Sequence, residues 1–184
     1  MRGHLYIITG PSGAGKTSVA MELLKRRPRL KKVVTCTTRP IREGEVDGLS
    51  YHFLTRETFQ GLIDMGAMFE WDEHYNHLYG SRREDVEMLM EAGNDVLFVV
   101  DVAGAATIKS ENPDALLFFI QAEGVNQLLE RITKRDKGNT TGLDERRAAI
   151  EKEMSFAHTA DHRIVNREGM LQETIVEIES LMNT

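Results

Sequence analysis

The stretch Gly10-Pro11-Ser12-Gly13-Ala14-Gly15-Lys16-Thr17 decides the fold, because it matches the phosphate-loop pattern G-x-x-x-x-G-K-[ST] at every fixed position. Residues 5–8 before it predict a buried strand, and the apolar stripe of residues 18–24 after it predicts a helix. Glycines let the chain turn tightly, and unpaired N–H groups at a helix start attract anions. The alternative is a glycine-rich turn that binds nothing, which the flanking strand and helix disfavour. The stretch therefore predicts a polyphosphate site, with Lys16 at the β- and γ-phosphates and Thr17 on Mg²⁺.

The composition suits a single intracellular domain. A length of 184 residues fits one α/β core with inserted subdomains. The net charge of −6, with dispersed basic residues, disfavours a nucleic-acid partner. Cys36 is the single cysteine and excludes a disulfide within the chain. The sequence shows neither a signal-peptide pattern nor an apolar run approaching the ~18 residues of a membrane span. We therefore expect a cytoplasmic protein without a membrane partner.

Strands alternate with helices along the chain, which predicts a parallel sheet covered by helices on both faces. We expect strands at residues 33–38, 51–54, 68–74, 96–101, 115–120 and 163–166. We expect helices that end before Pro28, that follow a Thr55 cap up to residue 65, and that cover residues 82–92, 125–135 and 143–158. A capping box of Ser81 and Glu84 is expected to begin the helix at residue 82. A closing helix has its apolar stripe at Leu171, Ile175, Ile178 and Leu181.

Short strands between residues 34 and 81 contrast with the helix-rich chain on either side. The predicted architecture is a phosphate-loop, three-layer α/β/α core made of residues 1–33, 82–124 and 160–184. A mixed-strand insert covers residues 34–81, and a helical lid covers about residues 125–159. Residues 136–142 are polar and contain glycine, so we expect a mobile loop within the lid.

Several polar residues suggest chemistry without proving it. Asp101 ends an apolar strand, where a second Mg²⁺ ligand would lie, although an aspartate there can also cap a helix. Arg39 and Arg42, with Tyr51 downstream, could grip a phosphate as paired guanidinium groups, or could be solvated surface arginines. Neither alternative is excluded by the spacing of the residues.

The residues that follow carry similar alternatives. The Glu70 carboxylate, with Tyr79 and Ser81 nearby, could accept N–H donors from a purine edge, or could face solvent. Arg131 and Arg135 are four residues apart on one helix face, and Arg146 lies beyond the loop. These arginines could neutralise a transferring phosphoryl group. They could also pair with the nearby acids Glu130, Asp136, Asp144 and Glu145. The histidines 74, 77, 158 and 162 lack metal-ligand companions, and we expect them to be structural or solvated.

Motifs from one family recur in order along nearly the whole chain. The signature T-T-R-x-P-R-x-G-E-x-x-G-x-x-Y-x-F is similar to residues 37–53, and F-x-E…Y-G-[ST] is similar to residues 69–81. D-x-x-G resembles residues 101–104, R-x-x-x-R resembles residues 131–135, and [IV]-V-N resembles residues 164–166. Together with the phosphate loop, these motifs make the chain resemble the guanylate kinases, which are phosphate-loop nucleoside monophosphate kinases.

The resemblance implies an enzyme that phosphorylates GMP to GDP with ATP and Mg²⁺ by in-line transfer. The residues that would bind ATP are Gly10, Pro11, Ser12, Gly13, Ala14, Gly15, Lys16, Thr17, Ser18 and Asn166. The residues that would bind GMP, mostly in the insert, are Thr35, Arg39, Arg42, Tyr51, Glu70, Tyr79, Gly80, Ser81, Asp101 and Gly104. The residues that would act on the reacting phosphates are Lys16, Arg39, Arg131, Arg135 and Arg146. Mg²⁺ would lie at Thr17 and Asp101, partly through water, and Asp101 has a second candidate role at guanine.

The chain departs from the family pattern at four places. Pro40 directly follows Arg39, where the family has Arg-x-Pro-Arg. Val99 replaces a frequent acid, Ala103 replaces a glutamine, and Thr35 replaces a commoner serine while keeping the hydroxyl. No residue expected to bind phosphate is lost by these changes.

Other functions stay open at this point. A related kinase could act on another acceptor, such as AMP, dTMP or a ribose bisphosphate. A non-catalytic guanylate-kinase-like module could instead bind phosphorylated peptides, although the intact Lys16 and Thr17 disfavour it. The chain is expected to be a monomer or a homodimer, with ATP and GMP as its small-molecule partners.

Overall fold

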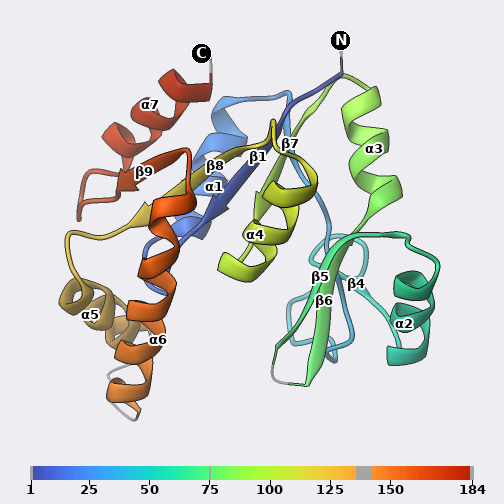
Figure 1. Ribbon diagram of the computed structural model, residues 1–184, viewed down its shortest axis with the longest axis horizontal. Coiled ribbons are helices and arrows are strands. Elements are labelled where there is room, and N and C mark those ends of the chain that lie inside the picture. Colours follow the sequence, from blue (N-terminus) through green and yellow to red (C-terminus); the bar gives the residue numbers. More distant parts are fainter. Residues whose placement is uncertain (1, 75, 136–141, 183–184) are drawn as a thin grey trace.

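The structure is a computed structural model that describes residues 2–74, 76–135 and 142–182 (Figure 1). The expected mobile loop at residues 136–142 lies outside the described residues except for Gly142, and so does Asp136. Both ends of the described chain lie at the top of Figure 1, away from the lid helices and from the second sheet.

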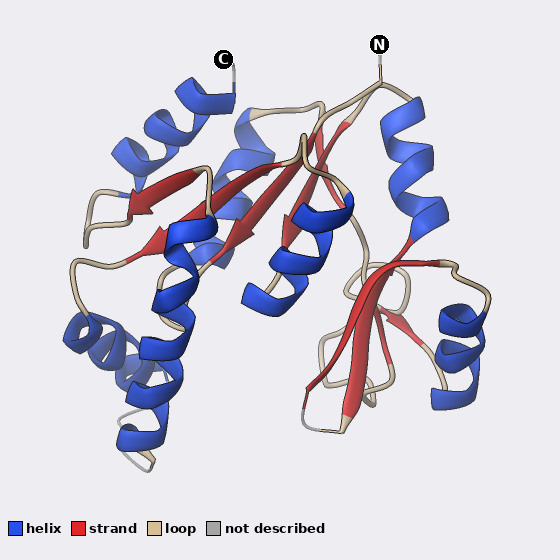
Figure 2. Ribbon diagram, viewed as in Figure 1, coloured by secondary structure: helices blue, strands red, loops and turns tan. Residues whose placement is uncertain are grey.

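A five-stranded sheet forms the centre of the molecule (Figure 2). Its strands, in spatial order, are β2 (Leu30–Lys32), β7 (Asp95–Val99), β1 (Leu5–Thr9), β8 (Leu116–Gln121) and β9 (His162–Val165). All neighbours pair in parallel. The inner strands are apolar on both faces, as parallel strands covered by helices must be. This arrangement confirms the predicted α/β fold with a parallel central sheet.

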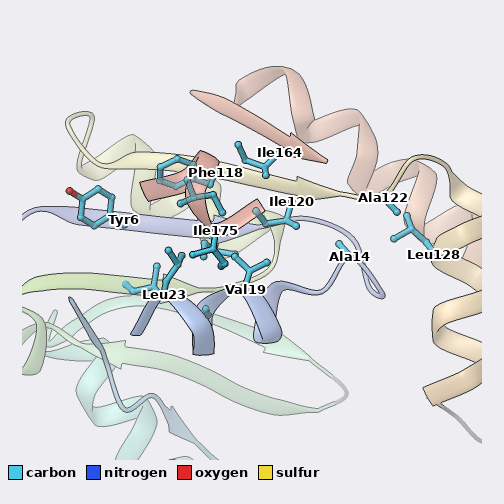
Figure 3. Packing of buried hydrophobic residues seen from close by; sticks show 14 of the residues in the cluster. Tyr6, Ala14, Val19, Leu23, Phe118, Ile120, Ala122, Leu128, Ile164 and Ile175 are labelled. Carbon is cyan, nitrogen blue, oxygen red and sulfur yellow. The ribbon is translucent and has the colours of Figure 1, made fainter. Parts of the chain in front are cut away.

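Helices cover both faces of this sheet. On one face, α1 (Lys16–Arg26) and α7 (Leu171–Met182) bury Leu23 and Ile175 against Phe118 of β8 (Figure 3). On the other face, α3 (Arg83–Glu91) and α4 (Val102–Glu111) pack Val86 and Ile108 against apolar strand residues. Burial of apolar surface stabilises the fold by about 25 cal/mol per Å², so these two clusters hold the helices firmly on the sheet.

A second, four-stranded sheet follows the order β4 (His52–Phe53), β3 (Cys36–Thr37), β6 (His77–Arg82) and β5 (Met68–His74). The β3–β4 pair is parallel and the other pairs are antiparallel, so this insert sheet is mixed. Its helix α2 (Arg56–Asp64) begins as expected, because the Thr55 hydroxyl accepts a hydrogen bond from the N–H of Thr58 at 3.1 Å. Phe59 of α2 is fully buried in the small core of the insert.

The lid region contains α5 (Val125–Arg135), which has the expected bounds, and α6 (Leu143–Ser155). A short 3₁₀ helix, η1 (Phe156–Thr159), ends the segment that the sequence predicted as one helix to residue 158. Figure 1 shows the lid pair and the insert sheet on opposite sides of α4. Because the phosphate loop, α4 and α5 follow β1, β7 and β8, they gather at the carboxyl ends of the parallel strands, where such folds bind ligands.

The expected strand at residues 33–38 is wrong. The chain instead forms β2 at Leu30–Lys32 in the central sheet and β3 at Cys36–Thr37 in the insert sheet. Lys31 and Lys32 are exposed on an edge strand, so its composition did not resemble that of a buried strand. The apolar run lies where the chain crosses between the two sheets, and Val33 is buried at this crossing.

The expected capping box is also wrong. Ser81 lies within β6, and α3 begins at Arg83 after Arg82, which makes no side-chain cap. The Ser81 hydroxyl instead donates to Glu70 at 2.7 Å, its cross-strand partner in β5. The helix α4 was not expected, since its alanine- and glycine-rich sequence lacks an amphipathic stripe. The predicted strand at residues 96–101 ends at Val99, and the strand expected at residues 163–166 lies one residue earlier.

Candidate functional site

The phosphate loop is shaped by its glycines. Gly10, Gly13 and Gly15 have φ angles of 134°, 81° and 92°, which side chains with a Cβ rarely adopt. A Cβ on Gly10 would lie 2.0 Å from the carbonyl oxygen of Ile120, so the loop packs directly on β8. Gly15 precedes the first residue of α1, and the N–H groups of that helix therefore open toward the loop.

Lys16 lies folded over the loop. Its Nζ donates to the carbonyl oxygens of Gly10 and Pro11, at 2.5 and 3.1 Å. Burial lowers the pKa of Lys16, while the carboxylates of Glu153 and Asp101 act in the opposite direction. A cavity of about 290 Å³ lies beside it, and we call it the loop cavity. It is lined by Ser12, Gly13, Gly15, Lys16, Thr17, Arg131 and Arg135.

The loop is braced from two later elements. Arg131 of α5 donates to the carbonyl oxygens of Asn166, at 3.0 Å, and Gly13, at 3.5 Å. The side-chain amide of Asn166, which is 8% exposed, donates to the carbonyl oxygen of Ala14 at 2.9 Å. These contacts make Asn166 a support of the loop, whereas its contact with adenine stays a prediction.

Glu153 was missed by the sequence reasoning, although it lies at the loop. Its Oε2 accepts from the backbone N–H of Ser12 at 3.4 Å. Burial raises the pKa of Glu153, and the positive charge of Lys16 opposes that shift. Glu153 belongs to α6, far along the chain from residue 12, so no local pattern links the two.

A second cavity, of about 170 Å³, lies between the insert sheet and the start of α4, and we call it the insert cavity. Its lining is Thr35, Tyr51, Glu70, Asp72, Tyr79, Gly80, Val99, Val100, Asp101 and Gly104. The structure therefore brings together seven residues that sequence reasoning assigned to GMP, namely Thr35, Tyr51, Glu70, Tyr79, Gly80, Asp101 and Gly104. Arg39, Arg42 and Ser81 were assigned with them but are not part of this lining. Asp72 is the lining carboxylate that this reasoning did not assign.

Glu70 is the buried acid of the insert cavity. It is 6% exposed, and its Oε1 accepts from the Ser81 hydroxyl at 2.7 Å. Burial raises the pKa of Glu70, and the charges of Asp101 and Asp72 raise it further. Bonds from Ser81 act against this shift without removing it. A carboxylate held in this way is well placed to accept N–H donors from a ligand.

Arg39 is held beside this cavity by Glu45, an acid to which the sequence reasoning gave no role. Its guanidinium donates to the two carboxylate oxygens of Glu45, at 3.0 and 2.7 Å, and its Cζ lies 5.5 Å from the centroid of the Tyr51 ring. The side chain is 8% exposed, and hydrogen bonding to Glu45 raises the pKa of Arg39. The exposed Arg42 contributes its backbone N–H to Glu45 at 2.8 Å.

Asp101 connects the two cavities. Its Oδ1 accepts from the N–H of Gly104 at 2.8 Å and caps α4, which is the structural alternative raised by the sequence. It also lines the insert cavity, and its charge acts on Lys16. Among the described residues, those expected at ATP or at the reacting phosphates that line neither cavity are Gly10, Pro11, Ala14, Ser18, Arg39, Arg146 and Asn166. Arg146 is half-buried on α6, and Ser18 is exposed on α1.

The donor chemistry fits a magnesium ion held largely by a nucleotide. Thr17 presents an exposed side chain at the loop cavity, and Asp101 offers a carboxylate nearby. Within residues 2–74, 76–135 and 142–182, no group of three acids, histidines or cysteines forms a metal cluster. Mg²⁺ commonly takes one or two protein oxygens, with phosphates and water as its other ligands. In the same residues, no helix is both long and apolar enough to span a bilayer.

Comparison with known proteins identifies the family of the chain. The family model described as guanylate kinase matches residues 2–184. A guanylate kinase of Thermus thermophilus is 36% identical over 182 residues, which is 99% of this chain and 81% of that protein. One from Synechocystis is 39% identical over 166 residues, 90% and 87% of the two chains.

A solved structure gives the same result in three dimensions. The crystal structure of guanylate kinase from Anaplasma phagocytophilum aligns with a TM-score of 0.77 and 26% sequence identity, covering 99% of this chain and 85% of that one. The match extends over the central sheet, the insert and the lid, because it covers nearly the whole chain. By its sequence and its fold, the chain belongs to the guanylate kinase family.

Proposed function

We propose that this chain transfers the γ-phosphoryl group of ATP to GMP, giving ADP and GDP, and so recycles guanine nucleotides. The observation that carries the proposal is the pair of cavities at one end of the sheet. One is lined by an intact phosphate loop, and the other by a buried glutamate and tyrosines next to an arginine. Asp101 lines the insert cavity, and its charge acts on Lys16 of the loop cavity. This position is expected if the two nucleotides meet between the cavities.

On the donor side, the chain supplies positive groups and N–H donors. The loop amides of residues 10–17 would enclose the ATP phosphates, and Lys16 would leave its carbonyl partners to bind the β- and γ-phosphates. Arg131 and Arg135 line the loop cavity, and with Arg146 from α6 they would neutralise charge that spreads over the transferred group. Catalysis would thus consist of positioning and charge neutralisation, with no covalent intermediate.

On the acceptor side, the proposal assigns the base and the phosphate to different residues. Guanine would donate its N–H groups to Glu70 and Asp101, with Ser81 and Thr35 beside them. The GMP phosphate would bind Arg39, Arg42, Tyr51 and Tyr79. Arg39 is already oriented by Glu45, so little side-chain freedom would be lost on binding.

Thr17 and Asp101 would hold Mg²⁺, partly through water. When bound, the ion neutralises negative charge on the phosphates. The same proposal includes the division into core, GMP-binding insert and lid at the boundaries expected from sequence, with closure of insert and lid to exclude water. It also includes a cytoplasmic location, where both nucleotides occur, and a monomeric or homodimeric state.

A coupled assay of ADP formation with a panel of acceptors tests this function. GMP should be used at least about 10²-fold more efficiently than AMP, dTMP or a ribose bisphosphate, since buried acceptors left unpaired discriminate strongly. A preference for one of the other acceptors would contradict the proposal. Calorimetric titration with ATP covers the non-catalytic alternative, because a phosphopeptide-binding module without nucleotide turnover would show neither ATP binding nor ADP release.

A further inference from the structure

Alternate residues of β5 form one wall of the insert cavity. Glu70 and Asp72 both line it, because side chains two residues apart lie on the same side of a strand. Trp71 between them is 45% exposed and is not part of the lining. Across the sheet, Glu70 pairs with Ser81 and Asp72 pairs with Tyr79. Asp72 therefore has a defined place along the cavity.

This place lies between the two ends of a bound nucleotide. Glu70 and Ser81 mark the end assigned to the base. Tyr79 lies opposite Asp72, but its longer side chain extends to Arg39, which is assigned to the phosphate. Two residues along a strand span roughly 6.6 Å, about the separation of a base edge from its sugar hydroxyls. Asp72 thus lies two residues along the strand from Glu70, at the level where the sugar of the nucleotide would lie.

The chemistry of Asp72 fits a sugar hydroxyl better than a phosphate. An ionised carboxylate accepts hydrogen bonds but donates none, and it repels a phosphate. Dinucleotide-binding folds use an acidic side chain in this way on ribose hydroxyls. Asp72 Oδ1 accepts from the N–H of Glu73 at 2.7 Å, which orients the carboxylate, and a carboxylate can accept several hydrogen bonds at once.

We propose that Asp72 accepts a hydrogen bond from a ribose hydroxyl of the acceptor nucleotide and makes the site selective for the ribonucleotide. Asp72 is thereby a residue that determines specificity, separate from those that bind guanine and phosphate. The inference rests on the proposed function, in that it takes the insert cavity to hold GMP.

Steady-state kinetics with GMP, 2′-deoxy-GMP and 3′-deoxy-GMP tests this inference. The unmodified protein should prefer GMP over at least one deoxy form by about 10-fold or more in kcat/KM, as for a hydrogen bond to a charged group. Asp72→Ala should bring that preference close to one, mainly by lowering kcat/KM for GMP. Glu73→Gln is the matched control, because it removes a neighbouring charge that pairs with Arg56 outside the cavity.

Two results would overturn the inference. One is an unchanged GMP preference in Asp72→Ala, and the other is an equal loss for all three acceptors, as expected if Asp72 reads the base. Asp72→Leu keeps about the size of the side chain, removes its hydrogen-bond acceptors, and gives the same answer if the alanine variant folds poorly. Calorimetric titration of the three acceptors without ATP separates the two proposals. An absence of turnover would refute the kinase function, while the ribose preference in binding would still decide the role of Asp72.

Discussion

The loop cavity and the insert cavity are built in different ways. The loop cavity is formed largely by the main chain of the phosphate loop, which glycines with positive φ shape. The Lys16 side chain folds back and donates to the carbonyl oxygens of Gly10 and Pro11 in the same loop. The insert cavity is formed by side chains that come from both sheets and from α4. Most residues of the first cavity come from one short stretch of sequence, with two arginines added from α5. The second cavity depends on how the insert lies against the core.

This difference has an energetic side. In the loop, polar groups already have partners: Ser12 donates to Glu153 and the Ala14 carbonyl accepts from Asn166. The insert cavity instead keeps a buried carboxylate, Glu70, whose pKa is raised by burial and by the acids around it. The burial of this carboxylate lowers the free energy of unfolding. A bound ligand that donates hydrogen bonds to the carboxylate would raise that free energy again.

The loop should be most sensitive to the loss of the Lys16 ammonium group. Lys16→Ala should lower kcat by at least about 10²- to 10³-fold, the usual cost of removing one group that stabilises transition-state charge. The thermal midpoint should change little, because the hydrogen bonds of Lys16 go to two carbonyl oxygens of the loop and not to the core. Steady-state kinetics and calorimetric melting measure the two quantities.

Lys25→Ala is the matched control, since Lys25 belongs to the same helix and its side chain is 69% exposed. Its kinetics should equal those of the unmodified protein. Near-normal turnover in Lys16→Ala would remove the basis for assigning the loop cavity to ATP.

The insert cavity should lose activity and gain stability when its buried acid is neutralised. Glu70→Gln keeps an acceptor for Ser81 but places an N–H₂ group where guanine would donate, so kcat/KM for GMP should fall about 10- to 100-fold. The KM for ATP should stay unchanged. An unaltered kcat/KM for GMP would refute the assignment of Glu70 to guanine.

The same variant makes a prediction about pH. The folded-state pKa of Glu70 is raised above the ordinary value of 4.5, so the folded protein binds this proton more tightly than the unfolded chain. The stability advantage of Glu70→Gln should therefore be absent below that value, grow as pH rises, and level off above the folded-state pKa. Urea unfolding at several pH values measures it, and an advantage that is largest in acid would have the wrong sign.

Arg39 offers a milder test of how the insert is built. Glu45→Gln removes the charge that holds the guanidinium from two sides, so Arg39 should lose orientation and the KM for GMP should rise about 5- to 10-fold. A smaller effect on kcat is expected. The exposed Glu43 lies in the same loop, and Glu43→Gln is the control for general charge loss. A lower KM in Glu45→Gln would mean that Glu45 competes with the phosphate instead of positioning Arg39.

The features that the sequence predicted most reliably are those that a local sequence pattern determines. The apolar stripe of α5, with Leu128 and Ile132 on one face, gave the bounds of that helix as observed, and the phosphate loop was identified from its own motif. The insert cavity was expected only through the family resemblance. Its lining runs from residue 35 to residue 104, and no local period links these residues.

The predictions that were wrong or incomplete concern residues whose partners are distant in sequence. Ser81 stands at capping-box spacing, but its partner is Glu70 across the sheet, so a long-range bond replaced the local one. Glu153 and Asp72 were not singled out, because their neighbours in space are distant in sequence. Glu153 contacts the phosphate loop at Ser12, and Asp72 pairs with Tyr79 of the next strand. Spacing along the chain does not reveal such partners, so it does not distinguish these two acids from acids on the surface.

The smallest effect is expected from the brace behind the loop. Asn166→Ala removes the donor to the carbonyl oxygen of Ala14, which is fully buried, at a cost of about 1–2 kcal/mol in unfolding free energy. The loop should become less ordered, and the KM for ATP should rise about threefold while the KM for GMP stays constant. Asn126→Ala is the control, because its bond to Arg147 lies at the exposed surface of the lid. If Asn166→Ala raised the two KM values equally, the loop would not be an independently braced unit, and the contrast between a main-chain site and a side-chain site would lose its support.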